Sequence, residues 1–170
     1  PNQSPSRPFE QTDINLNGNW APTGASQLSW ALGQTRRNDG LTTLRQPTWG
    51  LAGNWAASGK LNFNASWSKS IGSSETATVS TTTDNDNASL GANWQATPKL
   101  TLSGAVRSQQ VQYGGGGRTD QTTGGGVSLG YQALRSAQIT LSFDKEQRDS
   151  TDDSANFRCD KWSIGLRAAF

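Results

Sequence analysis

Apolar and polar residues alternate along most of the chain with a period of two, which is the side-chain period of a β-strand. Nine segments show this alternation, and we expect each to form a strand with one apolar face and one polar face. In the first segment Asp13, Asn15, Asn17 and Asn19 take the polar parity. The apolar parity comprises Ile14, Leu16, Gly18 and Trp20; Leu28, Trp30 and Leu32; Trp49, Leu51, Gly53 and Trp55; Leu61, Phe63, Ala65 and Trp67; Leu90, Ala92 and Trp94; Leu100, Leu102, Gly104 and Val106; Val127, Leu129 and Tyr131; Ile139, Leu141 and Phe143; and Trp162, Ile164, Leu166, Ala168 and Phe170.

Four segments of the chain resemble one another, and each predicts a strand, a tight turn and a second strand. Their anchor aromatic residues are Trp20, Trp55, Trp94 and Tyr131. The pattern predicts consecutive antiparallel hairpins in which short and long connections alternate. Short turns are expected at 22–25, 57–59, 97–98 and 134–136, and longer polar loops around 38–47, 72–87, 114–125 and 149–156.

The composition is too polar for an ordinary apolar core, since 32% of the 170 residues are hydrophobic and the mean hydropathy is -0.69. The seven tryptophans argue against disorder. No run of about 18 apolar residues exists, which excludes a membrane-spanning helix, whereas a spanning strand needs only about ten residues with every second one apolar. The N-terminal residues PNQSPSRPFEQ lack the features of a signal peptide, so we interpret the chain as processed or as beginning within a longer protein.

A soluble antiparallel sandwich would also have alternating strands. The connections favour a barrel, because short turns on the periplasmic rim and long loops on the outer rim are typical of outer-membrane proteins. The aromatic residues also favour it, since they fall at two levels, as interfacial girdles do. We therefore predict an all-β, antiparallel transmembrane β-barrel of the bacterial outer membrane. The two levels are Trp20, Trp55, Trp94, Tyr131 and Phe170 near short turns or the terminus, and Trp49, Trp67 and Trp162 toward the long loops.

The strand count predicts the C-terminal part of a larger barrel. If Phe170 ends at the periplasm, the last strand descends, and alternation makes the first strand descend as well. Single-chain bacterial barrels have even strand numbers, so about nine strands imply an odd number upstream. Residues 1–11 are then an extracellular loop or linker, and residues 12–170 are the transmembrane strands. A closed eight-stranded barrel with one misassigned strand and a wall completed by several chains are the alternatives.

The sequence predicts no enzyme activity and no cofactor. It contains no histidine, so it cannot supply the Ser-His or Asp-His pair of a hydrolase. Asp144 and Glu146 share the inward parity of one strand, a spacing that suits carboxylate catalysis, but we interpret them as part of a solvated wall. Arg107, Lys161 and Arg167 are further lumen-facing candidates among Asn, Ser, Thr, Gln and Gly. Such a wall suits sugars or mixed solutes better than ions of one sign.

The predicted loops carry acidic residues and glycine runs. The acidic residues could attract calcium or bridge to lipopolysaccharide, but no complete calcium loop is present and a solvated loop is the preferred interpretation. The glycine runs at 114–117 and 124–126 lack the helix and the Lys-Ser/Thr of a phosphate cradle and predict a mobile loop. The acidic residues are Asp84, Asp86, Asp149, Asp152 and Asp153.

Cys159 is the single cysteine. It falls on the inward parity and is expected to be a free thiol unless an upstream cysteine pairs with it. The net charge of +2, from 15 basic and 13 acidic residues, does not indicate nucleic-acid binding.

The C-terminal residues KWSIGLRAAF resemble the recognition strand of bacterial outer-membrane proteins, which alternates apolar residues and ends in an aromatic residue. This resemblance implies recognition by the barrel-assembly machinery through Trp162, Ile164, Leu166, Ala168 and Phe170.

The repeated NW, short turn and alternating strand resemble, over nearly the whole chain, the EpsL-type barrels encoded with exopolysaccharide synthesis genes. That resemblance implies a conduit or pore for exopolysaccharide or another polar solute. The alternative is a structural anchor or adhesion and assembly scaffold with a plugged lumen. Expected partners are outer-membrane lipid and lipopolysaccharide, the assembly machinery, polysaccharide, and remaining barrel strands or other envelope subunits.

Overall fold

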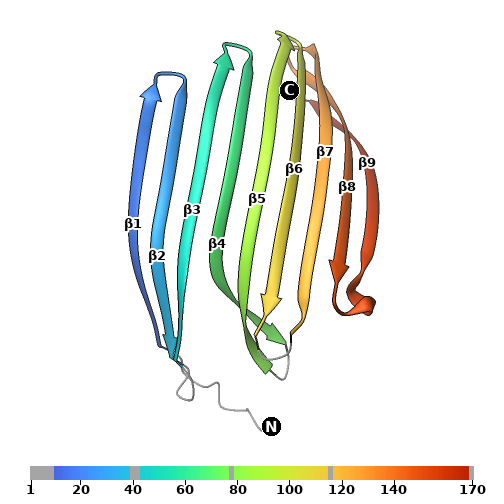
Figure 1. Ribbon diagram of the computed structural model, residues 1–170. Coiled ribbons are helices and arrows are strands. Elements are labelled where there is room, and N and C mark those ends of the chain that lie inside the picture. The colour runs from blue at the N-terminus through green and yellow to red at the C-terminus, as the bar shows by residue number, and fades with distance from the viewer. Residues whose placement is uncertain (1–9, 39–42, 77–78, 115–116, 169–170) are drawn as a thin grey trace.

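A computed structural model describes residues 10–38, 43–76, 79–114 and 117–168. In this part of the chain nine strands form a single antiparallel sheet in sequence order, which confirms the predicted all-β fold (Figure 1). No helix in these residues is both long and apolar enough to cross a membrane. The elements are β1 (Glu10–Thr23), β2 (Ser26–Asn38), β3 (Thr43–Ser58), β4 (Leu61–Thr76), β5 (Val79–Thr97), β6 (Leu100–Tyr113), β7 (Thr119–Leu134), β8 (Ala137–Ser150), the 3-10 helix η1 (Asp153–Ala155) and β9 (Phe157–Ala168).

The connections alternate between two opposite rims of the sheet (Figure 1). Two-residue turns at 24–25, 59–60, 98–99 and 135–136 join β1 to β2, β3 to β4, β5 to β6 and β7 to β8. The strand ends joined by the other four connections lie at the opposite rim, which we call the rim of the long connections, and η1 belongs to the last of these connections. The predicted alternation of the two rims is therefore present, but the connection from β4 to β5 spans only residues 77–78, so the long loop predicted at 72–87 is wrong.

Each short hairpin carries a one-residue register shift next to its turn. In the β5–β6 hairpin the turn pairs Thr97 with Leu100, yet Trp94 lies opposite Leu102. Without the shift Trp94 would lie opposite the polar Ser103, and the apolar face of one strand would meet the polar face of the next. The alternation of the sequence thus requires a β-bulge at each short turn.

The strands are longer than the sequence pattern predicted. The segment 72–87 was expected to be a loop, but β4 and β5 stay paired as far as Thr76 opposite Val79, so Asp84 and Asp86 lie in β5. Likewise Asp149 lies in β8, and the predicted loop glycines 124–126 lie in β7. Runs of polar residues indicate loops in the sequence, but a strand that continues beyond lipid satisfies its backbone hydrogen bonds through the ladder whatever its side chains are.

The predicted N-terminal boundary also moves. Strand β1 begins at Glu10, two residues before the expected start of the barrel at residue 12. Residues 1–9 of the predicted extracellular loop lie outside the described residues.

The described residues contain no buried hydrophobic side chain. The register places the apolar parities of neighbouring strands opposite one another, for example Leu90 opposite Val106. One face of the whole sheet is therefore apolar, and it is exposed, with Ile164 and Leu166 at 79% and 75%. A soluble protein does not expose a patch of this extent, whereas a lipid-facing wall requires one.

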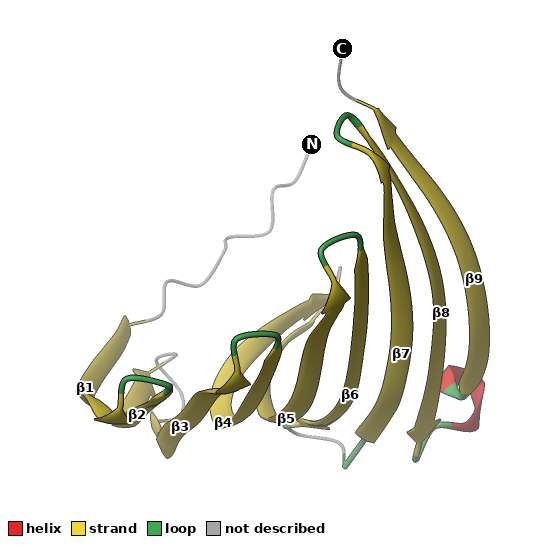
Figure 2. Cartoon of the chain, turned by 90° about the horizontal axis from the view of Figure 1, so that it is seen from above, coloured by secondary structure: helices red, strands yellow, loops and turns green. Residues whose placement is uncertain are grey.

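The sheet is curved, as Figure 2 shows from above. Along β8 the polar-face residues from Gln138 to Arg148 are half-buried, while the apolar-face residues Ile139, Leu141 and Lys145 are exposed. Strand β7 shows the same division around Leu129 and Tyr131. Side chains on the inside of a curve shield one another, so these exposures place the polar residues on the concave side.

Candidate functional site

The apolar face carries one aromatic level near the short turns. Trp20, Trp55, Trp94 and Tyr131 each lie three residues before the last residue of their strands, β1, β3, β5 and β7. All four side chains are exposed, by 45% to 61%. Amphipathic rings at a constant distance from one rim match the position of an interfacial girdle.

A second aromatic level borders the apolar face on the side of the long connections. Trp67 packs edge to face against Trp49, with ring centroids 4.5 Å apart, and its indole Nε1 donates to Asp86 Oδ1 at 2.8 Å. The next residue of the same parity on β4 is Lys69, which pairs with Asp84 at 3.0 Å. The apolar band therefore ends at the Trp49–Trp67 level, and charged residues follow.

On β9 the corresponding residue is Trp162, which packs against Phe143 with centroids 4.5 Å apart. It is followed toward the long connection by Asp160 at the same parity. Ile164 and Leu166, two residues of the predicted assembly strand, lie on the same exposed face. Phe170, the last residue of that strand, lies outside the described residues.

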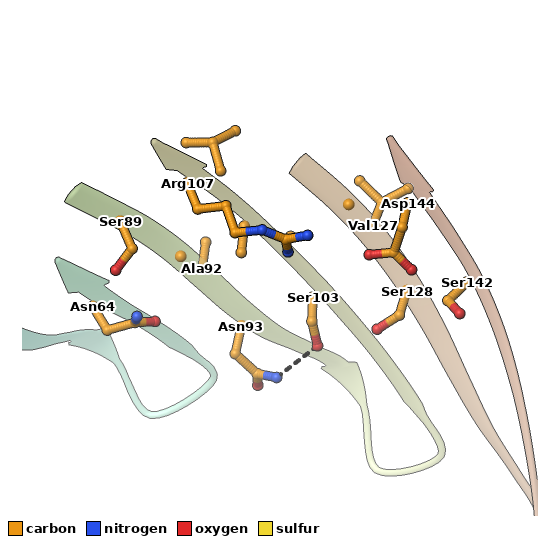
Figure 3. A pocket seen from close by; sticks show the side chains of 15 residues that line it. Asn64, Ser89, Ala92, Asn93, Ser103, Arg107, Val127, Ser128, Ser142 and Asp144 are labelled. Carbon is orange, nitrogen blue, oxygen red and sulfur yellow. Dashed lines mark hydrogen bonds between the residues drawn. The ribbon is translucent and has the colours of Figure 1, made fainter. Parts of the chain in front are cut away.

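The polar face contains a hollow of about 520 Å³ that crosses several strands (Figure 3). We call it the transverse trough. Its floor is a row of three small residues on adjacent strands, Gly91 on β5, Ala105 on β6 and Gly126 on β7. Asn64 on β4 and Asp144 on β8 continue this row at its two ends.

A row of hydroxyl and amide side chains borders the trough toward the short turns. The register aligns Asn93, Ser103, Ser128 and Ser142 across four strands. Asn93 Nδ2 donates to Ser103 Oγ at 2.9 Å, as the dashed line in Figure 3 marks. This border is uncharged and offers both donors and acceptors.

A charged row borders the trough on the other side. Ser89, Arg107, Gly124, Glu146 and Cys159 lie opposite one another in turn from β5 to β9. The Arg107 guanidinium donates to Glu146 and forms an ion pair with it, although β7 lies between their strands. Gly124 allows this crossing, because a Cβ there would approach Arg107 Nε to 3.2 Å.

The predicted lumen-facing residues all lie on the polar face. Asp144 lies opposite Lys161, and Arg167 lies opposite Gln138 near the short-turn rim. The structure brings Arg107 and Glu146 together and places Asp144 beside them at the end of the trough. Cys159 is an exposed free thiol in the charged row. The pairing of Glu146 with Arg107 favours its interpretation as part of a solvated wall.

A cluster of hydrogen-bonded polar residues lies at the rim of the long connections. Asp120, only 3% exposed, accepts from Arg118 Nε at 2.9 Å and from Ser150 Oγ at 2.6 Å. In the connection between β8 and β9, Asp152 caps η1 by accepting from the Ser154 side chain and backbone. These hydrogen bonds hold the pKa of Asp152 below its usual value, and the nearby Arg118 contributes further.

The predicted cation-binding residues do not gather into a metal site within the described residues, which contain no group of three or more His, Cys, Asp or Glu with metal-binding geometry. Asp84 is engaged with Lys69, and Gln46 donates to it at 2.9 Å. Asp86 accepts from Trp67. Asp149 accepts from Gln147 at 2.9 Å. These carboxylates therefore have partners within the chain.

The sheet with its exposed apolar band and its polar concave face agrees with the family that the sequence matches. Residues 33–170 match the model of the family described as "Putative beta-barrel porin 2". The chain belongs to this family. It is therefore a porin-like β-barrel chain of the outer membrane. No curated protein sequence matches the chain.

Solved outer-membrane structures share the fold of this porin-family chain at low sequence identity. The outer membrane channel DcaP of Acinetobacter baumannii is 12% identical with a TM-score of 0.66, and the match covers 94% of this chain and 52% of DcaP. In-vitro folded OmpT, an outer membrane protein of Vibrio cholerae, is 14% identical with a TM-score of 0.61, covering 93% and 55%. The NanC porin is 12% identical with a TM-score of 0.57, covering 94% and 79%. The chain thus spans about half the length of DcaP and OmpT.

The trough itself was not predicted from the sequence. Its floor residues Gly91, Ala105 and Gly126 are small, and its hydroxyl row was grouped only as part of a polar wall. Alternation assigns each residue to a face, but the alignment of five strands into rows depends on register across the long connections. The one usable indication was the glycine run of β7, which was assigned to a loop.

Proposed function

We propose that this chain forms the wall of a water-filled outer-membrane channel for uncharged, hydroxyl-rich solutes, and that it catalyses no reaction. Exopolysaccharide is the most specific candidate cargo. The observation that carries the proposal is the polar concave face opposite the exposed apolar band. Membership of a porin family supports a conducting lumen.

The charges of the polar face support an uncharged solute. Arg107 is paired with Glu146, and Lys161 lies opposite Asp144, so positive and negative groups alternate along the wall. A channel selective for anions or cations would present one sign. The serines and asparagines between these charges offer neutral hydrogen-bonding groups of the kind that wet a lumen.

The absence of a reaction has support in the same residues. The sequence has no histidine to act as a general base. Glu146, which could act with Asp144 as a carboxylate pair, is instead engaged in an ion pair with Arg107.

Single-channel conductance of the full-length protein in planar bilayers tests the proposal. Currents would be recorded with and without neutral and acidic oligosaccharides on one side of the membrane. We expect a steady open current with weak ion selectivity that neutral oligosaccharides interrupt. A folded, heat-modifiable protein that carries no current would contradict the conduit and favour an anchor or scaffold with a plugged lumen.

A further inference from the structure

We infer that the transverse trough is a binding site for a linear, uncharged oligosaccharide that lies across strands β5 to β8. This inference rests on the proposed channel and deepens it by assigning the residues that contact the solute. It draws on three independent features of the trough: its floor, the spacing of its hydroxyl row and the compensation of its charges.

The floor is shaped by the near absence of side chains. Gly91 and Gly126 have none, and Ala105 between them has a single methyl group. The Asn64 amide leans over Gly91 so closely that a Cβ there would lie 2.7 Å from its Oδ1. A side chain at Gly126 would likewise overlap Asp144. The Asn64 amide and the Asp144 carboxylate therefore cover the two glycines, and the hollow lies above these polar groups and the methyl group of Ala105.

The hydroxyl row repeats at the strand spacing. Asn93, Ser103, Ser128 and Ser142 lie on adjacent strands, which are about 4.8 Å apart. This step is comparable to the rise of one hexopyranose along a linear glycan, so successive sugar residues can each meet one group of the row. Ser and Asn side chains both donate and accept, as a sugar hydroxyl does.

The row is also directed along the path of transport. Strands of outer-membrane barrels tilt by roughly 35–45° from the barrel axis, so a row at right angles to the strands climbs the wall as it circles it. A glycan that follows the trough therefore advances through the membrane. Exchange between equivalent groups keeps the binding weak enough to permit release.

The charges at the trough favour an uncharged glycan over a polyanion. Arg107 is compensated by Glu146 and is not left as an anion-binding group. Asp144, at the end of the floor, presents a carboxylate that accepts hydrogen bonds from sugar hydroxyls and repels uronic acids. None of the residues that line the trough is aromatic, so recognition depends on hydrogen bonds rather than on stacking.

Filling the floor tests the inference. Ala105→Leu places a larger side chain in the trough, and Ala52→Leu makes the same change on the polar face of β3, outside the trough. The probes are maltohexaose, cellohexaose and hexagalacturonate, and the readout is the concentration that blocks half of the open current. We expect block by at least one neutral hexasaccharide, with hexagalacturonate at least threefold weaker. Ala105→Leu should weaken this block at least tenfold and Ala52→Leu less than twofold.

A second variant covers the case in which Ala105→Leu does not fold. Ser103→Ala removes one hydroxyl of the row with no added volume, and block should weaken at least threefold. The inference is overturned if the channel conducts and no neutral hexasaccharide blocks it, or if the trough variants and Ala52→Leu behave alike. If the folded protein carries no current, the proposed function fails by itself. In that case, titration calorimetry measures the affinity of the same sugars for wild type, Ala105→Leu and Ala52→Leu. The trough is the binding site if Ala105→Leu weakens the affinity at least tenfold and Ala52→Leu less than twofold.

Discussion

At the scale of single residues, the polar face depends on glycines that let neighbouring side chains cross a strand. The Arg107–Glu146 ion pair spans β7 above Gly124, where a Cβ would lie 3.2 Å from Arg107 Nε and the Arg107 side chain would have to shift by a few tenths of an ångström. Glycine in a strand often marks such a close approach. The pair balances two charges on the polar face, which supports the proposed preference for uncharged solutes.

Cys159 lies directly opposite Glu146 and reports this charge balance. Its rate of modification would be compared for anionic sulfonatoethyl and cationic trimethylammonium-ethyl methanethiosulfonate. Glu146→Gln should raise the anion-to-cation rate ratio at least fivefold, since a unit charge a few ångströms away contributes roughly 1 kcal/mol even in water and acts on the two reagents in opposite directions. Arg107→Gln should lower it. Asp160→Asn, a neighbour of Cys159 on the other face, is the control, and an equal effect there would contradict the charged row.

A second residue-scale prediction concerns how the Asp152 cap of η1 responds to low pH. The pKa of Asp152 lies below its usual value of 3.8, chiefly because the Ser154 hydroxyl donates to the carboxylate. The charged carboxylate therefore stabilises the capped loop fully at pH values above 3.8. That stabilisation is lost as the pH falls through the lowered pKa of the folded protein. Titration of the Asp152 carboxyl carbon by NMR should give a midpoint below 3.8, and Ser154→Ala should move it upward. A midpoint unchanged by Ser154→Ala would show that the cap does not act on Asp152.

At the scale of the strand, alternation alone identified all nine strands, because a residue on the wrong face would be exposed to lipid. Strand ends were predicted less well. Outward residues such as Leu61 to Trp67 change to Lys69 where the apolar band ends, yet β4 continues to Thr76. The sequence marks the limit of the lipid, whereas the end of the ladder depends on backbone pairing that polar side chains permit equally well.

Two adjacent residues of β7 test the division of the faces. Leu129 lies on the apolar face and Ser128 on the polar face. Leu129→Arg should lower the free energy of unfolding in lipid vesicles by about 2–4 kcal/mol, because a guanidinium near the bilayer midplane is costly. Ser128→Arg should change it by less than about 1 kcal/mol, since the polar face is wet. Unfolding in guanidinium chloride, followed by tryptophan fluorescence, measures the free energy of unfolding of both variants. An equal loss of stability in the two variants would contradict the assignment of the faces.

At the scale of the whole sheet, the trough exists only because five strands are in register. The short hairpins are nearly determined by sequence, since alternation and a two-residue turn together require the bulge beside Trp94 and its equivalents. Register across a long connection, such as Ala105 opposite Gly126, has no comparable constraint from the turn. Faces could therefore be predicted residue by residue, while a site built from rows could not.

The two rims of the sheet predict how the chain sits in the membrane. Ser136 lies in a two-residue turn and Asp153 in η1 at the opposite rim, and both are exposed. Short turns of outer-membrane barrels face the periplasm, so the rims should differ in access from outside the cell. In full-length protein with Cys159→Ser, Asp153→Cys should react with a polyethylene-glycol maleimide too large for pores in intact cells. Ser136→Cys should react only once the outer membrane is opened. The reverse order would invert the chain, and labelling of both in intact cells would contradict a wall that crosses the membrane.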